Sequence, residues 1–137
     1  MKKIFVLVIT FLMIFSFAGE LAYAIADEIS PYYLHIRSMA HSFDINTQTG
    51  ETTLIGDITI KSGASCSVNA TIKRQINGAW RNVIMFNDSG IDDATISETP
   101  YLSQGYKYKC VFTFTVYNSS GNIIEEKTFE SQEVDYR

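Results

Sequence analysis

Turn-forming residues recur at regular intervals along most of this chain. Gly, Asn and Ser suit the positive φ angles and the side-chain-to-backbone hydrogen bonds of turns. The turn signals are Thr47-Gln48-Thr49-Gly50, Ser62-Gly63-Ala64-Ser65, Asn77-Gly78, Asn87-Asp88-Ser89-Gly90, Ser103-Gln104-Gly105 and Ser119-Ser120-Gly121-Asn122. The segments between them are rich in Ile, Val, Thr, Tyr and Phe, which favour pleated strands. We therefore expect a series of short strands, and we find no helical spacing outside the first 24 residues.

Within three of these segments, apolar and mostly polar residues alternate with a period of two. The apolar sets are Leu54, Gly56, Ile58 and Ile60; Cys66, Val68, Ala70 and Ile72; and Tyr106, Tyr108, Cys110, Phe112, Phe114 and Val116. Successive side chains of a strand point to opposite faces, so each segment has one apolar face. This pattern is typical of two antiparallel sheets that share a core.

The pattern predicts an all-β fold, a seven-stranded antiparallel sandwich, because short strands separated by turns favour that architecture. The predicted strands are 34–46, 51–61, 66–76, 79–87, 92–98, 105–118 and 122–133. Asn77-Gly78 suits the type I′ turn of a tight hairpin. The irregular pattern from Arg37 to Met39 predicts a β-bulge.

The first 24 residues have the layout of a secretory signal peptide. Lys2 and Lys3 precede an uncharged apolar run from Ile4 to Phe17, and two overlapping A-x-A cleavage patterns follow, at Ala22-Tyr23-Ala24 and Ala24-Ile25-Ala26. An uncleaved anchor is the alternative, although the run is shorter than the roughly 20 residues of a spanning helix. We expect cleavage, and therefore a secreted, extracellular protein.

Removal of this leader changes the composition of what remains. Eighteen of the first 24 residues are apolar, against 46% of the whole chain, and the remainder is about 40% apolar, as in ordinary soluble domains. The predicted organisation is a signal peptide at 1–24, an N-terminal lead-in at 25–33 and a single domain at 34–137.

The leader carries two Lys and one Glu, so the formal net charge of −4 becomes −5 without it. Because the remaining Lys and Arg are scattered in the sequence, neither nucleic acid nor anionic lipid is expected as a partner. The sequence after the leader contains no second apolar stretch long enough to span a membrane, so we expect no membrane span in the mature form.

One local pattern is more specific than composition. The stretch from Leu102 through Gly105 to Tyr108 resembles the entry to the sixth strand of fibronectin type III domains, with Gln104 in place of the usual proline. In those domains the tyrosine hydroxyl bonds to the upstream backbone, an arrangement called the tyrosine corner. The resemblance implies that role for Tyr108, and Trp80 is a candidate for a core tryptophan.

The chain from residue 25 onward also resembles a group of functionally uncharacterised small secreted Gram-positive proteins. The recurring motifs are Gly78-Ala79-Trp80, Gly105-Tyr106-Lys107-Tyr108 and Val116-Tyr117-Asn118-Ser119-Ser120-Gly121. These motifs are structural. The resemblance implies an immunoglobulin-like or fibronectin-III-like sandwich, and it implies no chemistry.

Cys66 and Cys110 are the only cysteines, and export permits a disulfide between them. Both fall on the apolar side of their strands. However, antiparallel pairing of the third and sixth strands places Cys66 nearer Val116 than Cys110. A disulfide and two separate buried thiols are therefore both open.

Candidate catalytic and metal-binding groups are sparse. His35 and His41 lack a Cys-rich or His-rich cluster. The residues Asn87, Asp88, Asp92 and Asp93 match no EF-hand spacing and favour an acidic loop. No G-x-S-x-G turn occurs, and the Glu residues of the last strand favour an exposed edge protected by charge. We expect no catalytic residues, no metal, no cofactor and no enzymatic activity.

Tyrosines at loops, termini and outward positions are the candidate binding surface. They are Tyr32, Tyr33, Tyr101 and Tyr117, with Tyr136 near the C-terminus. Tyrosine gives stiff contact area with a polar tip, which suits a cell-wall glycan or an extracellular protein. The predicted role is extracellular binding, at the cell envelope or to a protein ligand. The alternative is a secreted antibacterial factor or an inhibitor of an extracellular enzyme.

Overall fold

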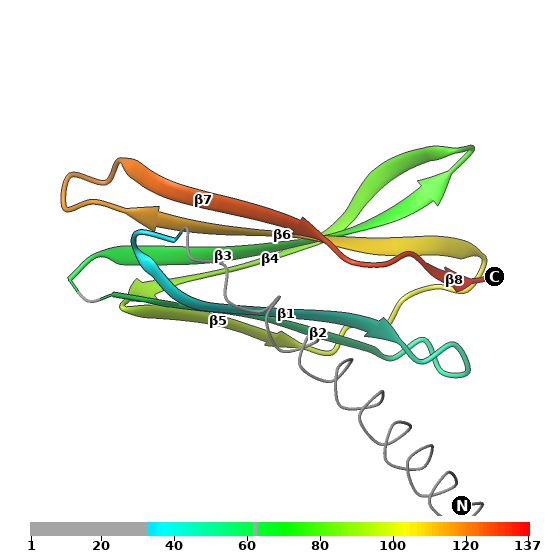
Figure 1. Cartoon of the computed structure of the whole chain (residues 1–137). Coiled ribbons are helices and arrows are strands. Elements are labelled where there is room, and N and C mark those ends of the chain that lie inside the picture. The colour runs from blue at the N-terminus through cyan, green and yellow to red at the C-terminus, as the bar shows by residue number, and fades with distance from the viewer. Residues whose placement is uncertain (1–32, 62) are drawn as a thin grey trace, which may run out of the picture. The chain divides into compact units, whose positions relative to one another are not determined.

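The structure, a computed structural model, describes residues 33–61 and 63–137. The expected signal peptide lies outside the described residues. Among the described residues, no helix is long and apolar enough to cross a membrane. Residues 34–137 form one compact unit. Its strands are β1 (Ile36–Ile45), β2 (Thr52–Ile60), β3 (Ser65–Ile76), β4 (Ala79–Ile91), β5 (Asp93–Glu98), β6 (Tyr106–Tyr117), β7 (Ile123–Glu130) and β8 (Val134–Tyr136) (Figure 1).

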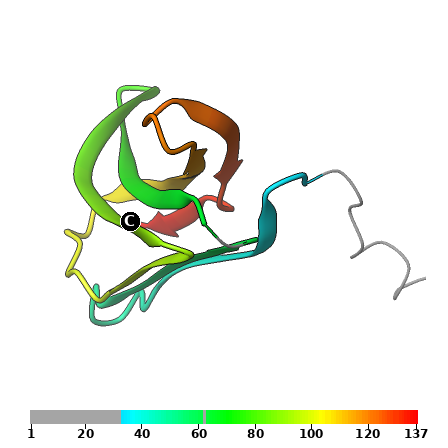
Figure 2. The ribbon, with the colours of Figure 1, turned by 90° about the vertical axis from the view of Figure 1, so that its left-hand side faces the viewer.

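These strands form two antiparallel sheets. One has the order β1-β2-β5 and the other β4-β3-β6-β7, and β8 pairs with the part of β6 that β7 does not reach. Figure 2 shows the two layers end-on, facing each other. The predicted all-β sandwich is therefore confirmed, except that the last expected strand, 122–133, ends at Glu130 as β7, and an unpredicted eighth strand, β8, follows it.

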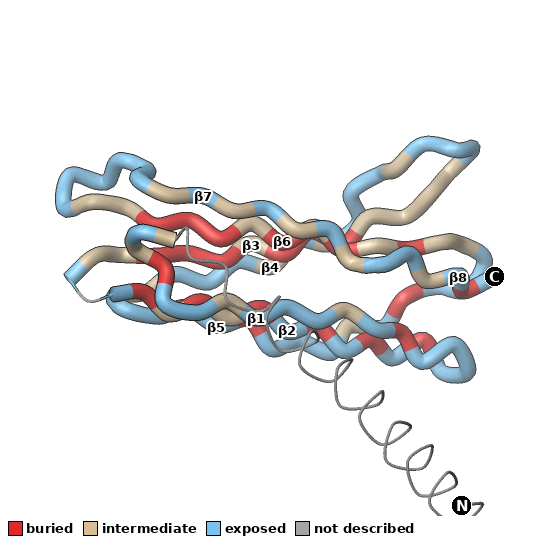
Figure 3. Tube along the Cα trace, viewed as in Figure 1, coloured by how far each residue is buried: buried red, intermediate tan, exposed pale blue. Residues whose placement is uncertain are grey.

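The core lies between the two layers, where the alternating apolar positions meet (Figure 3). Phe112 and Phe114 of β6 are fully buried, as are Leu54 and Ile58 of β2. Burial of each large apolar side chain contributes about 2–3 kcal/mol. Gly56 keeps the layers close, because a Cβ there would lie 3.0 Å from Val68 Cγ2.

Two local predictions are confirmed. Asn77 and Gly78 have φ angles of 50° and 79°, as a type I′ turn requires. The β1–β2 register shifts between Ile36 and Ser38, which is the expected bulge.

The expected end of the fourth strand is wrong. Asn87-Asp88-Ser89-Gly90 was interpreted as a turn, but β4 continues to Ile91, and these residues pair with positions 66–69 of β3. The chain reverses at Asp92 instead, which has a φ of 70°. Pairing with a complete neighbouring strand overrides the turn preference of these residues. As a consequence, Asn87 and Ser89 lie on a sheet rather than in a loop.

Candidate binding face

Short polar side chains cover the middle of the outer face of the five-stranded sheet. Outward residues of β3 alternate with its buried ones, and the register aligns each with outward residues of the neighbouring strands. Two adjacent rows run across the four strands: Ser89–Ser67–Thr115–Glu126 and Asn87–Asn69–Thr113–Thr128. Apart from Glu126, every side chain in these rows is an uncharged hydroxyl or amide.

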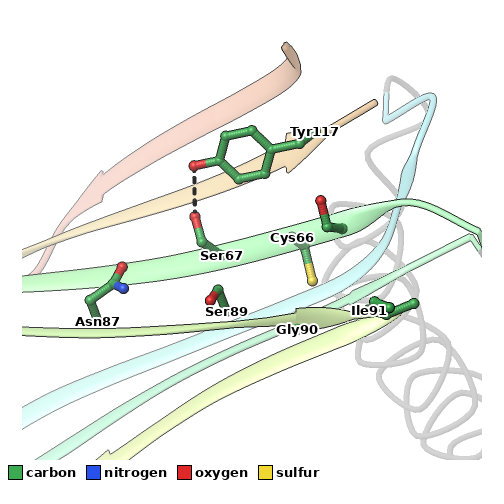
Figure 4. Close-up of a pocket in the computed structure, with 8 residues that line it drawn as sticks. Cys66, Ser67, Asn87, Ser89, Gly90, Ile91 and Tyr117 are labelled. Carbon is green, nitrogen blue, oxygen red and sulfur yellow. Dashed lines mark hydrogen bonds between the residues drawn. The ribbon is translucent and has the colours of Figure 1, made fainter. Parts of the chain in front are cut away.

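A third row, Ile91–Ser65–Tyr117–Ile123, closes this surface at the strand ends. Between it and Asn87 lies a depression of about 470 Å³. Its lining residues are Ser65, Cys66, Ser67, Asn87, Ser89, Gly90, Ile91 and Tyr117 (Figure 4). We call it the polar depression.

The floor of the polar depression is recessed and its rim is higher. Ser67 on the floor is only 9% exposed, whereas Ser89 and Asn87 on the rim are exposed. The Tyr117 hydroxyl lies 3.1 Å from Ser67 Oγ, a hydrogen bond that fixes the ring over the floor. Figure 4 shows Ser67 and Asn87 on the same side of the sheet as this hydroxyl, and the Cys66 sulfur on the other.

The Asn87 amide is open to a ligand. Within residues 33–61 and 63–137 its side chain makes no hydrogen bond, so both its donor and its acceptor groups are unused. Glu126, by contrast, accepts a 3.3 Å hydrogen bond from the Thr115 hydroxyl. The polar depression thus presents uncharged donors and acceptors beside a fixed aromatic ring, a combination suited to a neutral, hydroxyl-rich ligand.

A second depression of about 280 Å³ shares Ser65 and Ile91 with the first. The loop that lines its far side includes Asn118, whose Oδ1 accepts 2.9 Å hydrogen bonds from the backbone of Ser120 and Asn122. The open surface therefore continues over the strand ends onto a loop held in one conformation.

The structure does not bring the predicted tyrosine surface together. Tyr32 lies outside the described residues, and Tyr33 is half-buried. Tyr101 is 70% exposed beside Glu51, at the end of the sandwich opposite Tyr117. Tyr136 is only 8% exposed, so its interpretation as an exposed residue near the C-terminus is wrong. Of this set, Tyr117 borders the polar depression.

Tyr108 makes the hydrogen bond that defines a tyrosine corner. Its hydroxyl donates to the Ser103 carbonyl oxygen over 2.7 Å. Gly105 supplies the turn with a φ of 107°, and Leu102 is buried beneath it. Burial raises the pKa of the Tyr108 phenol above its usual value, against the opposing effect of Arg74.

Cys66 and Cys110 are separate buried thiols. Cys66 pairs with Val116, whereas Cys110 pairs with Ile72, six positions farther along β3. At roughly 3.4 Å per residue the two α-carbons are about 20 Å apart, beyond the roughly 7 Å limit of a disulfide. Burial raises the pKa of the Cys110 thiol to about 12, and burial together with nearby Asp93 raises that of Cys66.

The other candidate residues have structural contacts. The His41 ring lies 5.2 Å from the Phe112 ring and 5.0 Å from the Phe129 ring. Asp88 accepts a hydrogen bond from the Thr95 backbone, and Asp92 accepts one from that of Gly63. Within residues 33–61 and 63–137, no group of three or more His, Cys, Asp or Glu could hold a metal ion.

The core tryptophan expectation is wrong. Trp80 lies half-buried on the outer face of the sheet, where Lys109 Nζ sits 4.7 Å from its ring centre. Alternation in β4 places it outward, because it pairs with outward Gln75.

No protein family, curated protein or solved structure was found to match this chain. The site must therefore be interpreted from its own geometry.

Sequence reasoning missed Asn87 and Ser89 because Asn87 to Gly90 resembled a loop, and it missed Ser67 because its partners come from other strands. The polar positions that alternate with the apolar ones in β3 could have indicated this surface. Three short polar residues in succession at these positions mark a face that does not join the core.

Proposed function

We propose that this protein is an exported, non-catalytic binding domain that holds a neutral glycan in the polar depression. The main support for this proposal is that the Tyr117 ring, held by its hydrogen bond to Ser67, lies in the same depression as the Asn87 amide, which makes no hydrogen bond within the described residues. Sugar hydroxyls exchange hydrogen bonds with such groups, and the apolar face of a sugar ring suits contact with tyrosine.

The composition of the face favours a glycan over a protein partner. Protein interfaces depend on buried Trp, Tyr and Arg anchors, and Ser and Thr contribute little to them. Here Ser67 forms the floor and pairs with Thr115 of β6, and Asn69 and Thr113 form the next row. Short side chains also lose little rotamer freedom when a ligand binds.

Two further parts of the proposal rest on other support. Export is supported by the signal-peptide pattern of residues 1–24. A fibronectin-III-like type of sandwich is supported by the place of β4 beside β3, in the order β4-β3-β6-β7, and by the Tyr108 corner. A fold does not determine a function, so the proposed function depends on the residues of the polar depression.

The test is titration calorimetry of the purified protein with N-acetylglucosamine oligomers, beside sedimentation with insoluble bacterial cell-wall glycan. We expect saturable binding that Asn87→Ala weakens about tenfold, since one hydrogen bond of about 1.4 kcal/mol corresponds to that factor. Tyr101→Ala, at the other end of the sandwich, is the matched control and should bind normally.

An unchanged affinity in Asn87→Ala, or a loss confined to Tyr101→Ala, would contradict the proposed site. Growth arrest of bacteria or inhibition of an extracellular enzyme, without any glycan binding, would favour the antibacterial or inhibitory role instead.

A further inference from the structure

The β3–β4 hairpin extends beyond the rest of its sheet. β3 pairs with β6 only as far as Arg74, opposite Tyr108, and the residues from Gln75 to Trp80 pair only with one another. Figure 1 shows this hairpin, in green, diverging from β6 toward its tip. We call the segment 73–82, together with Lys109 beside it, the basic arm.

Positive charge gathers on the basic arm. Arg74 lies directly opposite Arg81, and Lys73 lies directly opposite Lys109. The sequence-based expectation that the cations are scattered is therefore wrong at this end of the sheet. Scattered charge therefore no longer argues against a polyanionic partner.

Like charges directly opposite one another destabilise a pair of strands. Glu130 relieves one pair, because its carboxylate lies 2.8 Å from Lys109 Nζ. No salt bridge from any residue in 33–61 or 63–137 reaches Arg74 or Arg81. The charges of these two arginines are therefore not neutralised by a salt bridge within the described residues and are available to an external anion.

Aromatic rings fix two of these cations. The Arg74 guanidinium lies 4.7 Å from the centre of the Tyr106 ring, and Lys109 Nζ lies at the same distance from that of Trp80. The two stacks occupy opposite faces of the sheet, because Arg74 pairs with inward Tyr108 and Lys109 points outward. The Arg74 side chain also acts on the Tyr108 hydroxyl, whose pKa it lowers against the larger effect of burial, and the five N–H donors of a guanidinium leave others for an anion.

We propose that the basic arm binds the phosphate groups of an anionic polymer. The planar guanidinium fork matches phosphate oxygens in pairs. The α-carbons of antiparallel partners such as Arg74 and Arg81 lie about 5 Å apart, close enough for both side chains to contact one phosphate. The cations lie at the base of the exposed hairpin, on both faces of the sheet, instead of converging in a cavity, which suits repeated charges on a flexible chain. This site is separate from the polar depression at the other end of β3.

Trp80 is the only tryptophan of the chain and is part of the basic arm, so its fluorescence reports binding directly. The test titrates the purified protein with long-chain inorganic polyphosphate at 50 mM and 200 mM salt. We expect a saturable change in emission, and an affinity roughly tenfold or more weaker at the higher salt, as contact with about three phosphates requires.

The decisive variant is the double substitution Arg74→Gln with Arg81→Gln, which should weaken binding at least tenfold. Its matched control removes two cations from the other sheet and its margin, with Arg37→Gln and Lys61→Gln, and should bind polyphosphate nearly as the parent does. Arg81→Gln alone, at an exposed position, should weaken binding at least threefold and serves if the double variant does not fold.

The proposal is overturned if the parent shows no binding at 50 mM salt, or if the arm and control variants lose affinity equally. It is also overturned if poly-glutamate binds as tightly as polyphosphate at equal charge, because an acidic peptide would then be the better partner.

Discussion

The corner between β4 and β5 should tolerate no side chain at Gly90. A Cβ built there lies 2.2 Å from the Asp93 carbonyl oxygen, a backbone atom that cannot rotate away. Only Asp92 separates the two strands, so the chain has no slack with which to move that oxygen. Overpacking of this kind costs about 1–3 kcal/mol, and we expect Gly90→Ala to lower the free energy of unfolding by about 2 kcal/mol.

For a domain of this size, about 2 kcal/mol lowers the thermal midpoint by roughly 8–16 °C. Urea unfolding followed by circular dichroism measures the free energy, and a thermal scan gives the midpoint. Ser89→Ala, an exposed neighbour on the same strand, should change stability by less than about 0.5 kcal/mol. If Gly90→Ala matches Ser89→Ala, the tight corner does not exist as described.

Three further predictions concern groups inside the fold. Tyr108→Phe should destabilise the domain by about 1–2 kcal/mol in urea unfolding, because it leaves the Ser103 carbonyl without its partner; a loss below 0.3 kcal/mol would contradict a structural role for the corner. Cys66 and Cys110 should resist alkylation in the native protein and react completely in denaturant without reductant, as mass spectrometry would show; a fraction that needs reductant would indicate a disulfide. Because burial raises the pKa of Cys110 from 9.0 to about 12, the unfolded thiol ionises first, so the free energy of unfolding should fall as pH rises from 9 toward 12. Cys110→Ala should make that slope shallower, with Cys66 and Tyr108 accounting for the remainder, and an equal slope in both proteins would assign it to other groups.

The sequence allowed the architecture to be predicted because its information is local. Alternation in β3 and β6 determined which side chains face the core, and Asn77-Gly78 determined a hairpin with its turn type. The resemblance around Leu102 and Tyr108 placed a hydrogen bond that the structure contains.

The site could not be predicted in the same way, because it depends on register between distant segments. Ser67 and Tyr117 are 50 residues apart and meet only through the pairing of β3 with β6. The sequence alone does not show that Arg74 and Arg81 are neighbours, because they become a like-charge pair only when the hairpin forms. The turn preference of Asn87 predicts a loop, because the sequence does not show that β3 pairs with it.

The one-residue crossing at Asp92 also bears on where the domain opens first. A strand pair cannot separate there without drawing the opposite sheet with it, so amides near the polar depression should exchange slowly with solvent deuterium. The hairpin from Gln75 to Trp80 has no third strand, and its amides should exchange fastest among the paired residues. One sheet thus carries a preorganised surface at one end and an adaptable one at the other. A ligand of the first would bind at little conformational cost, whereas a polymer on the second would order the hairpin as it binds.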